Sequence, residues 1–272
     1  MMSTDANLLR VNFFRDIFKF VVIKITRVNM KKYFLMSLIT LSLSVTAEEA
    51  PHWSYEGKAG PENWGELSDS YSTCKTGKFQ SPIDIRNALP AALPPLSLIF
   101  HVAAERIVNN GHTLQVTVDD EDDFRLDNEI FKLKQYHFHS PSENLINGKQ
   151  YPLEAHFVHA NERGELAVVA VMFETGEENP ALKPILESMP LTRDHSVSLA
   201  KQLNISRLFP ADRHYYRFSG SLTTPPCTEG LRWLVFKNSI TLSPEQLAKF
   251  QLALQHSNNR PVQPLNGRIV ID

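Results

Sequence analysis

The chain has 272 residues, of which 42% are hydrophobic and 21% are charged, and its formal net charge is −2. This length and composition are those of a globular protein that can bury a substantial core. Lys and Arg together number 28 against 30 for Asp and Glu, so there is no polybasic surface and nucleic acid is not expected as a partner.

The N-terminal part has the pattern of a signal peptide. A basic start at residues 30–32 precedes an apolar stretch over residues 33–45, and a small-residue cleavage site ends at Ala47. We therefore interpret residues 30–47 as a signal peptide. The apolar stretch is short for a membrane span, so no stable membrane anchor is expected.

Residues 1–29 precede this signal and have two explanations. Either the start of the gene is assigned too far upstream, or the chain carries a genuine amphipathic extension. In both cases we predict an exported protein whose single folded domain spans residues 48–272. The expected compartment is the periplasm, with secretion as the alternative.

The folded part is predicted to be rich in strands. Six segments have the apolar or alternating composition of β-strands, namely residues 114–118, 131–139, 151–159, 166–173, 214–219 and 231–236. Two helices are expected, one starting at the capping box Ser243-Pro244-Glu245-Gln246 and a shorter one at Asn179-Pro180. This pattern predicts a sheet-dominated α+β domain in which the sheet is mainly antiparallel.

Three histidines in two of these strands form the most informative pattern. His137 and His139 are two residues apart, so their side chains share one face of a strand. His156 lies in the next strand, which the polar connection of residues 140–150 allows to pair antiparallel with the first. A single buried histidine is usually a core residue, but three on paired strands indicate a zinc site with its fourth position open to water. Imidazole also suits other divalent ions.

Each strand also offers a polar residue two positions before a histidine. Gln135 precedes His137 and Glu154 precedes His156, so each shares the face of its histidine. Metal-binding imidazoles donate their second N–H to such oxygen atoms. The alternative for Glu154 is a charge at the rim or in a salt bridge.

Together with motifs elsewhere, these segments resemble the α-class carbonic anhydrases, in particular the exported bacterial type. The resemblance runs in family order from about residue 52 to the C-terminus. Its segments are residues 52–55, 60–64, 80–85, 109–112, 135–140, 142–143, 154–161, 219–229 and 258–265. It implies a large, mostly antiparallel twisted sheet with short helices on the surface, in one domain.

The resemblance implies a role for each matching residue at the metal. His137, His139 and His156 would bind Zn²⁺, with Gln135 and Glu154 as their hydrogen-bonded supports and the backbone carbonyl near Asn258 supporting His139. Thr223 would accept a hydrogen bond from zinc-bound hydroxide, and Glu143 would accept the proton of Thr223. The alternative for Glu143 is a solvated loop residue, and residues 223–226 on their own are a turn signal.

The resemblance also implies a proton path and a substrate wall. His112 would be the proton shuttle, with Tyr55, Asn110 and Gln115 organising a water chain. The alternative for His112 is a turn histidine without a role. Thr224 would line the cleft, and an apolar wall would hold the substrate: Val158, Val168, Leu222, Leu231 and Trp233, all of which are ordinary core residues in any other β protein.

The implied reaction is the reversible hydration of carbon dioxide to bicarbonate and a proton, catalysed by a lyase. Zinc-bound hydroxide would attack carbon dioxide, His112 would carry the proton away, and sulfonamides and anions would inhibit. One alternative is a binding protein that kept this fold and lost the chemistry, although all the implied ligands are present. The other is an esterase, which we expect only as a side activity.

The two cysteines are the last feature. Cys74 and Cys227 are the only ones in the chain, and an exported protein favours their pairing. Similar exported family members carry such a bond, which here would tie the segment after Thr223 to the N-terminal part of the domain. The alternative is a pair of free thiols.

Overall fold

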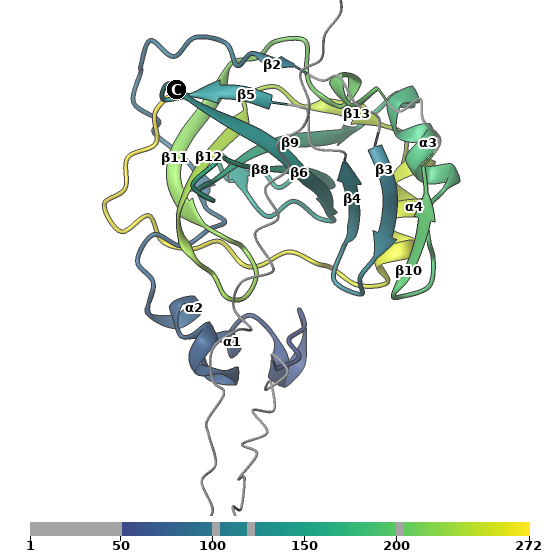
Figure 1. Cartoon of the computed structure of the whole chain (residues 1–272), viewed down its shortest axis with the longest axis horizontal. Coiled ribbons are helices and arrows are strands. Elements are labelled where there is room, and N and C mark those ends of the chain that lie inside the picture. Colours follow the sequence, from purple (N-terminus) through teal and green to yellow (C-terminus); the bar gives the residue numbers. More distant parts are fainter. Residues whose placement is uncertain (1–50, 100–103, 119–122, 200–203) are drawn as a thin grey trace, which may run out of the picture. The chain divides into compact units, whose positions relative to one another are not determined.

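The computed structural model describes residues 51–99, 104–118, 123–199 and 204–272 (Figure 1). The predicted signal peptide over residues 30–47 and the segment 1–29 lie outside the described residues.

A large twisted sheet forms the centre of the domain (Figure 1). Among the described residues eleven strands share it, in the order β10-β3-β4-β6-β8-β9-β12-β11, with β5 beside β6, β2 beside β5 and β13 beside β9. Its strands are β2 (Leu98–Ile99), β3 (Ala104–Asn109), β4 (Leu114–Val118), β5 (Asp123–Leu126), β6 (Glu129–His139), β8 (Leu153–Ala160), β9 (Leu166–Thr175), β10 (His195–Ser198), β11 (Tyr215–Ser221), β12 (Glu229–Phe236) and β13 (Ile240–Leu242).

The pairing is antiparallel except where β12 and β13 run parallel to β9. A separate two-stranded parallel sheet joins β1 (Asp84–Ile85) to β7 (Leu145–Ile146). The predicted sheet-dominated α+β class is confirmed, and each of the six predicted strand segments falls on a strand.

Short helices cover the sheet or precede it. They are η1 (Gly57–Ala59), α1 (Trp64–Leu67), η2 (Asp69–Tyr71), α2 (Thr73–Thr76), η3 (Pro180–Leu182), α3 (Lys183–Glu187), η4 (Ile205–Leu208) and α4 (Pro244–Leu254). Both predicted helices are confirmed. Ser243 and Gln246 form the capping box of α4, and Asn179 caps η3. Within the described ranges, no helix is long and apolar enough to cross a membrane.

The two faces of the sheet carry two core clusters. In β9, Val169 and Val171 belong to the larger cluster, whereas Val168 and Met172 belong to the smaller one. Successive residues of a strand face opposite sides, so the sheet separates the clusters. The smaller cluster lies on the face that carries the histidines, since it contains Trp233, whose ring lies 4.9 Å from that of His156.

A bulge in β6 decides which of its residues share the sheet face of His137. The register against β8 shifts between Leu133 and Gln135. These two residues are two positions apart in β6, but their partners in β8, His159 and Val158, are consecutive. Such an extra residue reverses the alternation of faces. Leu133 therefore lies in the larger core cluster, while Gln135 and His137 line the opposite side.

Candidate metal centre and its cavity

Two neighbouring strands bring the three histidines together. His137 of β6 is the direct cross-strand partner of His156 of β8, and His139 lies one pleat further along β6. One ring nitrogen from each of the three lies within 4.8 Å of the others. The antiparallel pairing of β6 with β8 thus builds the cluster that the sequence predicts.

The second nitrogen of each ring contacts an oxygen atom. His137 Nδ1 lies 2.8 Å from Gln135 Oε1, and His139 Nδ1 lies 2.7 Å from the carbonyl oxygen of Asn258. His156 Nε2 lies 2.9 Å from Glu154 Oε1. The amide oxygen of Gln135 and the carbonyl oxygen of Asn258 can only accept, so Nδ1 of His137 and Nδ1 of His139 donate. The neighbouring Glu154 carboxylate favours the proton of His156 on Nε2. The other nitrogen of each ring, which is Nε2 in His137 and His139 and Nδ1 in His156, keeps its lone pair.

This donor set fits a zinc ion. His139 Nε2 is buried and has no hydrogen-bond partner, which is costly unless something binds there. Burial lowers the pKa of all three imidazoles, so they are neutral at pH 7, as metal ligands must be. Three neutral imidazoles with a fixed tautomer are the ligand set of a zinc site that has one open position.

Glu154 is a fully buried carboxylate whose partners are all present. Its Oε2 accepts the backbone N–H groups of Glu143 at 2.7 Å and Asn144 at 2.9 Å, and its Oε1 accepts the Asn144 side chain at 2.8 Å. Burial raises the pKa of Glu154, and the hydrogen bonds from Asn144 oppose that rise. The loop between β6 and β8 therefore holds the acceptor of His156 in place.

Glu143 lies between the histidines and Thr223. Its Oε2 is 3.5 Å from His139 Nε2, its Oε1 accepts the Arg260 backbone N–H at 2.9 Å, and the Thr223 side chain donates a hydrogen bond to it. Burial raises the pKa of Glu143 to about 8, against the lowering effect of the Arg260 and Thr223 hydrogen bonds. The structure thus brings Glu143 and Thr223 together beside the metal cluster.

The three histidines open into a cavity of about 170 Å³. One part of its wall is apolar, and another part carries the side chains predicted for a water chain. Predicted residues that line it are Tyr55, Asn110, His112, Gln115, Val158, Val168, Leu222, Thr223, Thr224 and Trp233. Burial raises the pKa of Tyr55 well above its usual value, and the nearby Glu143 adds to that rise, so this phenol is protonated at neutral pH.

Leu231 is the exception among the predicted wall residues. It is buried in the smaller core cluster together with Val168 and Trp233, and it is not among the residues that line the cavity. Leu231 shares a strand face with Trp233 but lies two residues nearer the start of β12. It therefore supports the apolar wall by packing.

His112 lies at the wall of the cavity, half-buried under an aromatic ring. Its imidazole stacks on Trp53 with ring centroids 3.8 Å apart and an interplanar angle of 12°. The ring of His52 lies 6.0 Å away. The pKa of His112 is lowered to about 4, first by burial and then by the charges of Arg193, His52 and His256.

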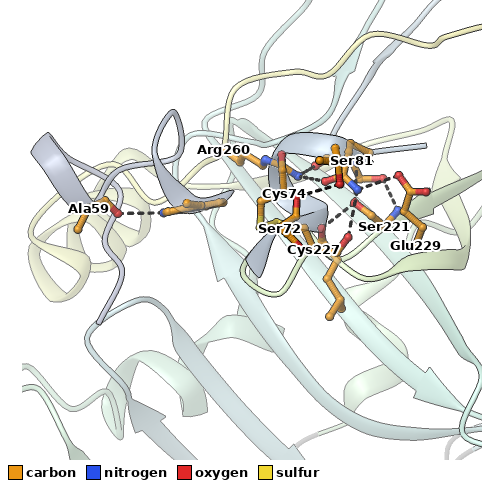
Figure 2. The surroundings of a disulfide bond; sticks show 12 residues. Ala59, Ser72, Cys74, Ser81, Ser221, Cys227, Glu229 and Arg260 are labelled. Carbon is orange, nitrogen blue, oxygen red and sulfur yellow. Dashed lines mark hydrogen bonds between the residues drawn. A yellow bond between two sulfur atoms is a disulfide. The ribbon is translucent and has the colours of Figure 1, made fainter. Parts of the chain in front are cut away.

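The predicted disulfide between Cys74 and Cys227 is confirmed, with Cα atoms 5.0 Å apart (Figure 2). It joins α2 to the turn that follows Thr223. The carbonyl of Cys227 also accepts a hydrogen bond from Gln80 Nε2 at 3.0 Å. The bridge and this hydrogen bond hold the turn against the N-terminal part of the domain.

Arg260 lies beside the disulfide (Figure 2) and also contacts Glu143. Its backbone N–H holds Glu143, and its buried guanidinium donates to Gln80 Oε1 at 2.9 Å, to the Ser81 carbonyl at 2.8 Å and to the Cys74 carbonyl at 3.1 Å. Burial lowers the pKa of Arg260 to about 10, so it remains a cation at neutral pH.

Several of these residues carry no signal that sequence reasoning could use for their role. Arg260 acts through contacts with segments far apart in the chain, and Asn144 holds Glu154 ten residues further along. Trp53 and Thr113 line the cavity but resemble ordinary loop and strand residues in the sequence.

The chain is similar to known proteins over most of its length. The family model for eukaryotic-type carbonic anhydrases matches residues 59–272. A carbonic anhydrase of Pectobacterium carotovorum is 50% identical over 234 residues, which are 86% of this chain and 96% of the relative.

Solved structures agree with this match. The α-carbonic anhydrase of Thermovibrio ammonificans, in complex with the inhibitor sulfanilamide, is 48% identical with a TM-score of 0.80, over 82% of this chain and 99% of that one. The α-carbonic anhydrase of Photobacterium profundum is 49% identical with a TM-score of 0.77, over 81% of this chain and 100% of that one. The chain therefore belongs to the α-carbonic anhydrase family of enzymes.

Proposed function

We propose that the protein catalyses the reversible hydration of carbon dioxide to bicarbonate and a proton, with one Zn²⁺ held by His137, His139 and His156. The observation that carries the proposal is the convergence of three ring nitrogens, one from each histidine, within 4.8 Å in the wall of a cavity that is partly apolar. When bound there, zinc supplies a Lewis acid that makes water nucleophilic at neutral pH.

Thr223 and Glu143 orient the attacking solvent molecule in this proposal. The Thr223 hydroxyl donates its proton in a hydrogen bond to Glu143, so this proton is not available to another acceptor. Its oxygen then has only acceptor positions to offer to the cavity. A nucleophile that donates to that oxygen is held in one orientation, which lowers the entropic part of the barrier.

The apolar wall receives carbon dioxide, which is uncharged and has no hydrogen to donate. Val158, Val168, Leu222 and Trp233 line this part of the cavity, and Thr224 lies beside them. Apolar surface favours such a substrate over water.

His112 carries the proton away in this proposal, through water molecules organised by Tyr55, Asn110 and Gln115. All four residues line the same cavity. Imidazole is the side chain whose ordinary pKa suits proton relay near neutral pH. In His112→Ala, turnover at low buffer concentration should fall and should recover when imidazole is added to the solution. A buffer dependence equal to that of the unaltered protein would remove His112 from this role.

The experiment that tests the proposed reaction combines metal analysis with a pH-drop assay. We expect about one Zn²⁺ per chain, loss of carbon dioxide hydration on chelation, and recovery when zinc is restored. Sulfanilamide, the inhibitor in the complex of the Thermovibrio ammonificans relative, should inhibit, and so should simple anions. A zinc-loaded, folded protein that does not hydrate carbon dioxide would contradict the proposal.

A side activity towards activated esters belongs to the same proposal. A nucleophile made at the metal can attack an ester carbonyl, but a cavity of about 170 Å³ favours small substrates. Turnover of carbon dioxide and of an ester on one preparation should therefore differ strongly in favour of carbon dioxide.

Export completes the proposal. We propose that residues 30–47 are removed, that residues 48–272 form the mature catalytic domain, and that the protein acts in the periplasm. The Cys74–Cys227 bond supports an oxidising compartment. N-terminal sequencing of the mature protein tests the boundary, and an N-terminus upstream of residue 30 would contradict it.

A further inference from the structure

Arg193 lies beside the turn that carries His112. It is two residues before β10, and the sheet pairing places His195 of β10 opposite Asn109 of β3. The Asp194 N–H donates to the Asn109 carbonyl at 2.7 Å. β10 pairs with β3 at the edge of the sheet (Figure 1). Because His112 follows β3 by three residues, this pairing brings Arg193 close to the turn.

The contact between Arg193 and the turn is close. Gly111 has φ +79°, and a Cβ atom built on it would lie 2.3 Å from Arg193 Nε and 2.7 Å from Cζ. The guanidinium therefore rests on the backbone immediately before His112. The positive φ favours glycine at this position, and the missing side chain leaves room for the guanidinium.

The same guanidinium also contacts the imidazole of His52. Arg193 Nη2 lies 3.4 Å from His52 Nε2. A guanidinium only donates, so His52 Nε2 must be the acceptor in this contact. His52 is in turn 6.0 Å from His112, measured between ring centroids.

Most of the charged and titratable groups that face His112 oppose its protonation. After burial, Arg193 is the largest cause that lowers the pKa of His112, followed by His52 and His256, and Asp194 alone among these groups raises it. Asp194 Oδ2 is 3.6 Å from Arg193 Nε, so the carboxylate offsets part of this cation.

We infer that Arg193 is a positioning residue of the proton path, whose cation, held against the His112 turn by the β3–β10 pairing, opposes protonation of His112 and slows proton uptake from the cavity. The inference rests on the proposed shuttle role of His112. A proton relay works best when its pKa lies near the working pH. Arg193 therefore limits turnover when buffer cannot replace the shuttle.

The test is Arg193→Gln, with NMR titration of the His112 ring and turnover at low and high buffer. We expect the pKa of His112 to rise by about half to one pH unit. Turnover at low buffer should rise about twofold to threefold, and turnover at saturating buffer should stay constant. The titration is done with and without zinc, so this readout does not depend on catalysis.

Three further variants distinguish the effect of the Arg193 charge from a structural effect of its replacement. Arg193→Lys keeps the cation and should restore the original pKa and turnover. Asp194→Asn should lower the pKa of His112 further, and asparagine suits the φ of 59° at that position. Arg125→Gln removes an exposed cation elsewhere and should change neither readout.

An unchanged His112 pKa in Arg193→Gln would overturn the inference. A raised pKa without faster turnover at low buffer would overturn the claim that Arg193 slows proton uptake. Failure of the shuttle role gives a different pair of results. The buffer dependence of turnover would then be unchanged in His112→Ala, while Arg193→Gln would still shift the pKa of the His112 ring.

Discussion

His137 of β6 and His156 of β8 are direct cross-strand partners, and their ring centroids lie 5.3 Å apart at an interplanar angle of 85°. The register of the two strands places the two rings at this separation. The second nitrogen of each ring already contacts an acceptor, Gln135 or Glu154. The metal site is therefore preorganised by the sheet.

Replacing one of these ligands should remove the metal without unfolding the sheet. In His137→Ala only two lone-pair nitrogens remain, so we expect substoichiometric zinc by metal analysis and loss of carbon dioxide hydration. His195→Ala is the matched control, because His195 is exposed on β10 and lies outside the metal cluster. Full zinc occupancy in His137→Ala would show that this ring is not a ligand.

The hydrogen bond between Thr223 and Glu143 should matter for the chemistry and not for metal retention. Thr223→Ala removes both the proton that Glu143 accepts and the oriented oxygen, so we expect turnover to fall about 100-fold at constant zinc content. Thr223→Ser keeps the hydroxyl and should retain most of the activity. Equal activity of the alanine and serine variants would mean that the hydroxyl has no orienting role.

The zinc-free protein should lose stability as the pH falls below about 6.5. Burial lowers the pKa of His159 to about 3 and also lowers the pKa of the three metal-site histidines. These rings stay neutral in the folded state but take up protons when unfolded. The unfolded state therefore binds more protons, which costs up to about 1.4 kcal/mol per pH unit for each ring.

The buried carboxyls act in the opposite sense but are outnumbered. Burial raises the pKa of Glu143 to about 8 and raises that of Glu154, so each keeps its proton in the folded state at a pH where the unfolded carboxyl has lost it. Urea unfolding with a chelator at pH 7, 6 and 5 measures the balance. A free energy of unfolding that is constant or rises towards pH 5 would contradict this assignment of protonation states.

Reduction of the disulfide should destabilise the fold. Cys74 and Cys227 are 153 residues apart, and closing so long a loop is worth about 4–5 kcal/mol in the loop-entropy description. We expect a clear drop of the unfolding midpoint with reductant. The double variant Cys74→Ala with Cys227→Ala should start from the lower midpoint and should not respond. A midpoint insensitive to reductant in the unaltered chain would contradict the stabilising role.

Local sequence patterns predict much of the fold and the metal cluster. The alternation in β6 and β8 places His137, His139 and His156 on paired strands, and the capping box marks the start of α4. These features depend on neighbours in the sequence. The roles of Thr223 and Glu143 came from the family resemblance, since neither residue has a local signature.

Features that depend on pairing between distant segments could not be predicted from the sequence. The bulge between Leu133 and Gln135 reverses the faces of β6, and only the register against β8 reveals it. The parallel pairing of β12 with β9 and the buried position of Leu231 follow from the order of strands. Arg193 gains its place from the edge strand β10, which has a mostly exposed, polar sequence without a strand signal.

The most direct test is a crystal structure of the zinc-loaded protein. We predict one zinc ion bound by the three imidazole nitrogens of His137, His139 and His156, with a solvent oxygen in the fourth position. Glu143 Oε2 lies 3.5 Å from His139 Nε2 and has no hydrogen-bond partner, so it is a protein atom that could compete for that position. A zinc ion with the Glu143 carboxylate as its fourth ligand, or with one of the three histidines turned away, would contradict the proposed catalytic site.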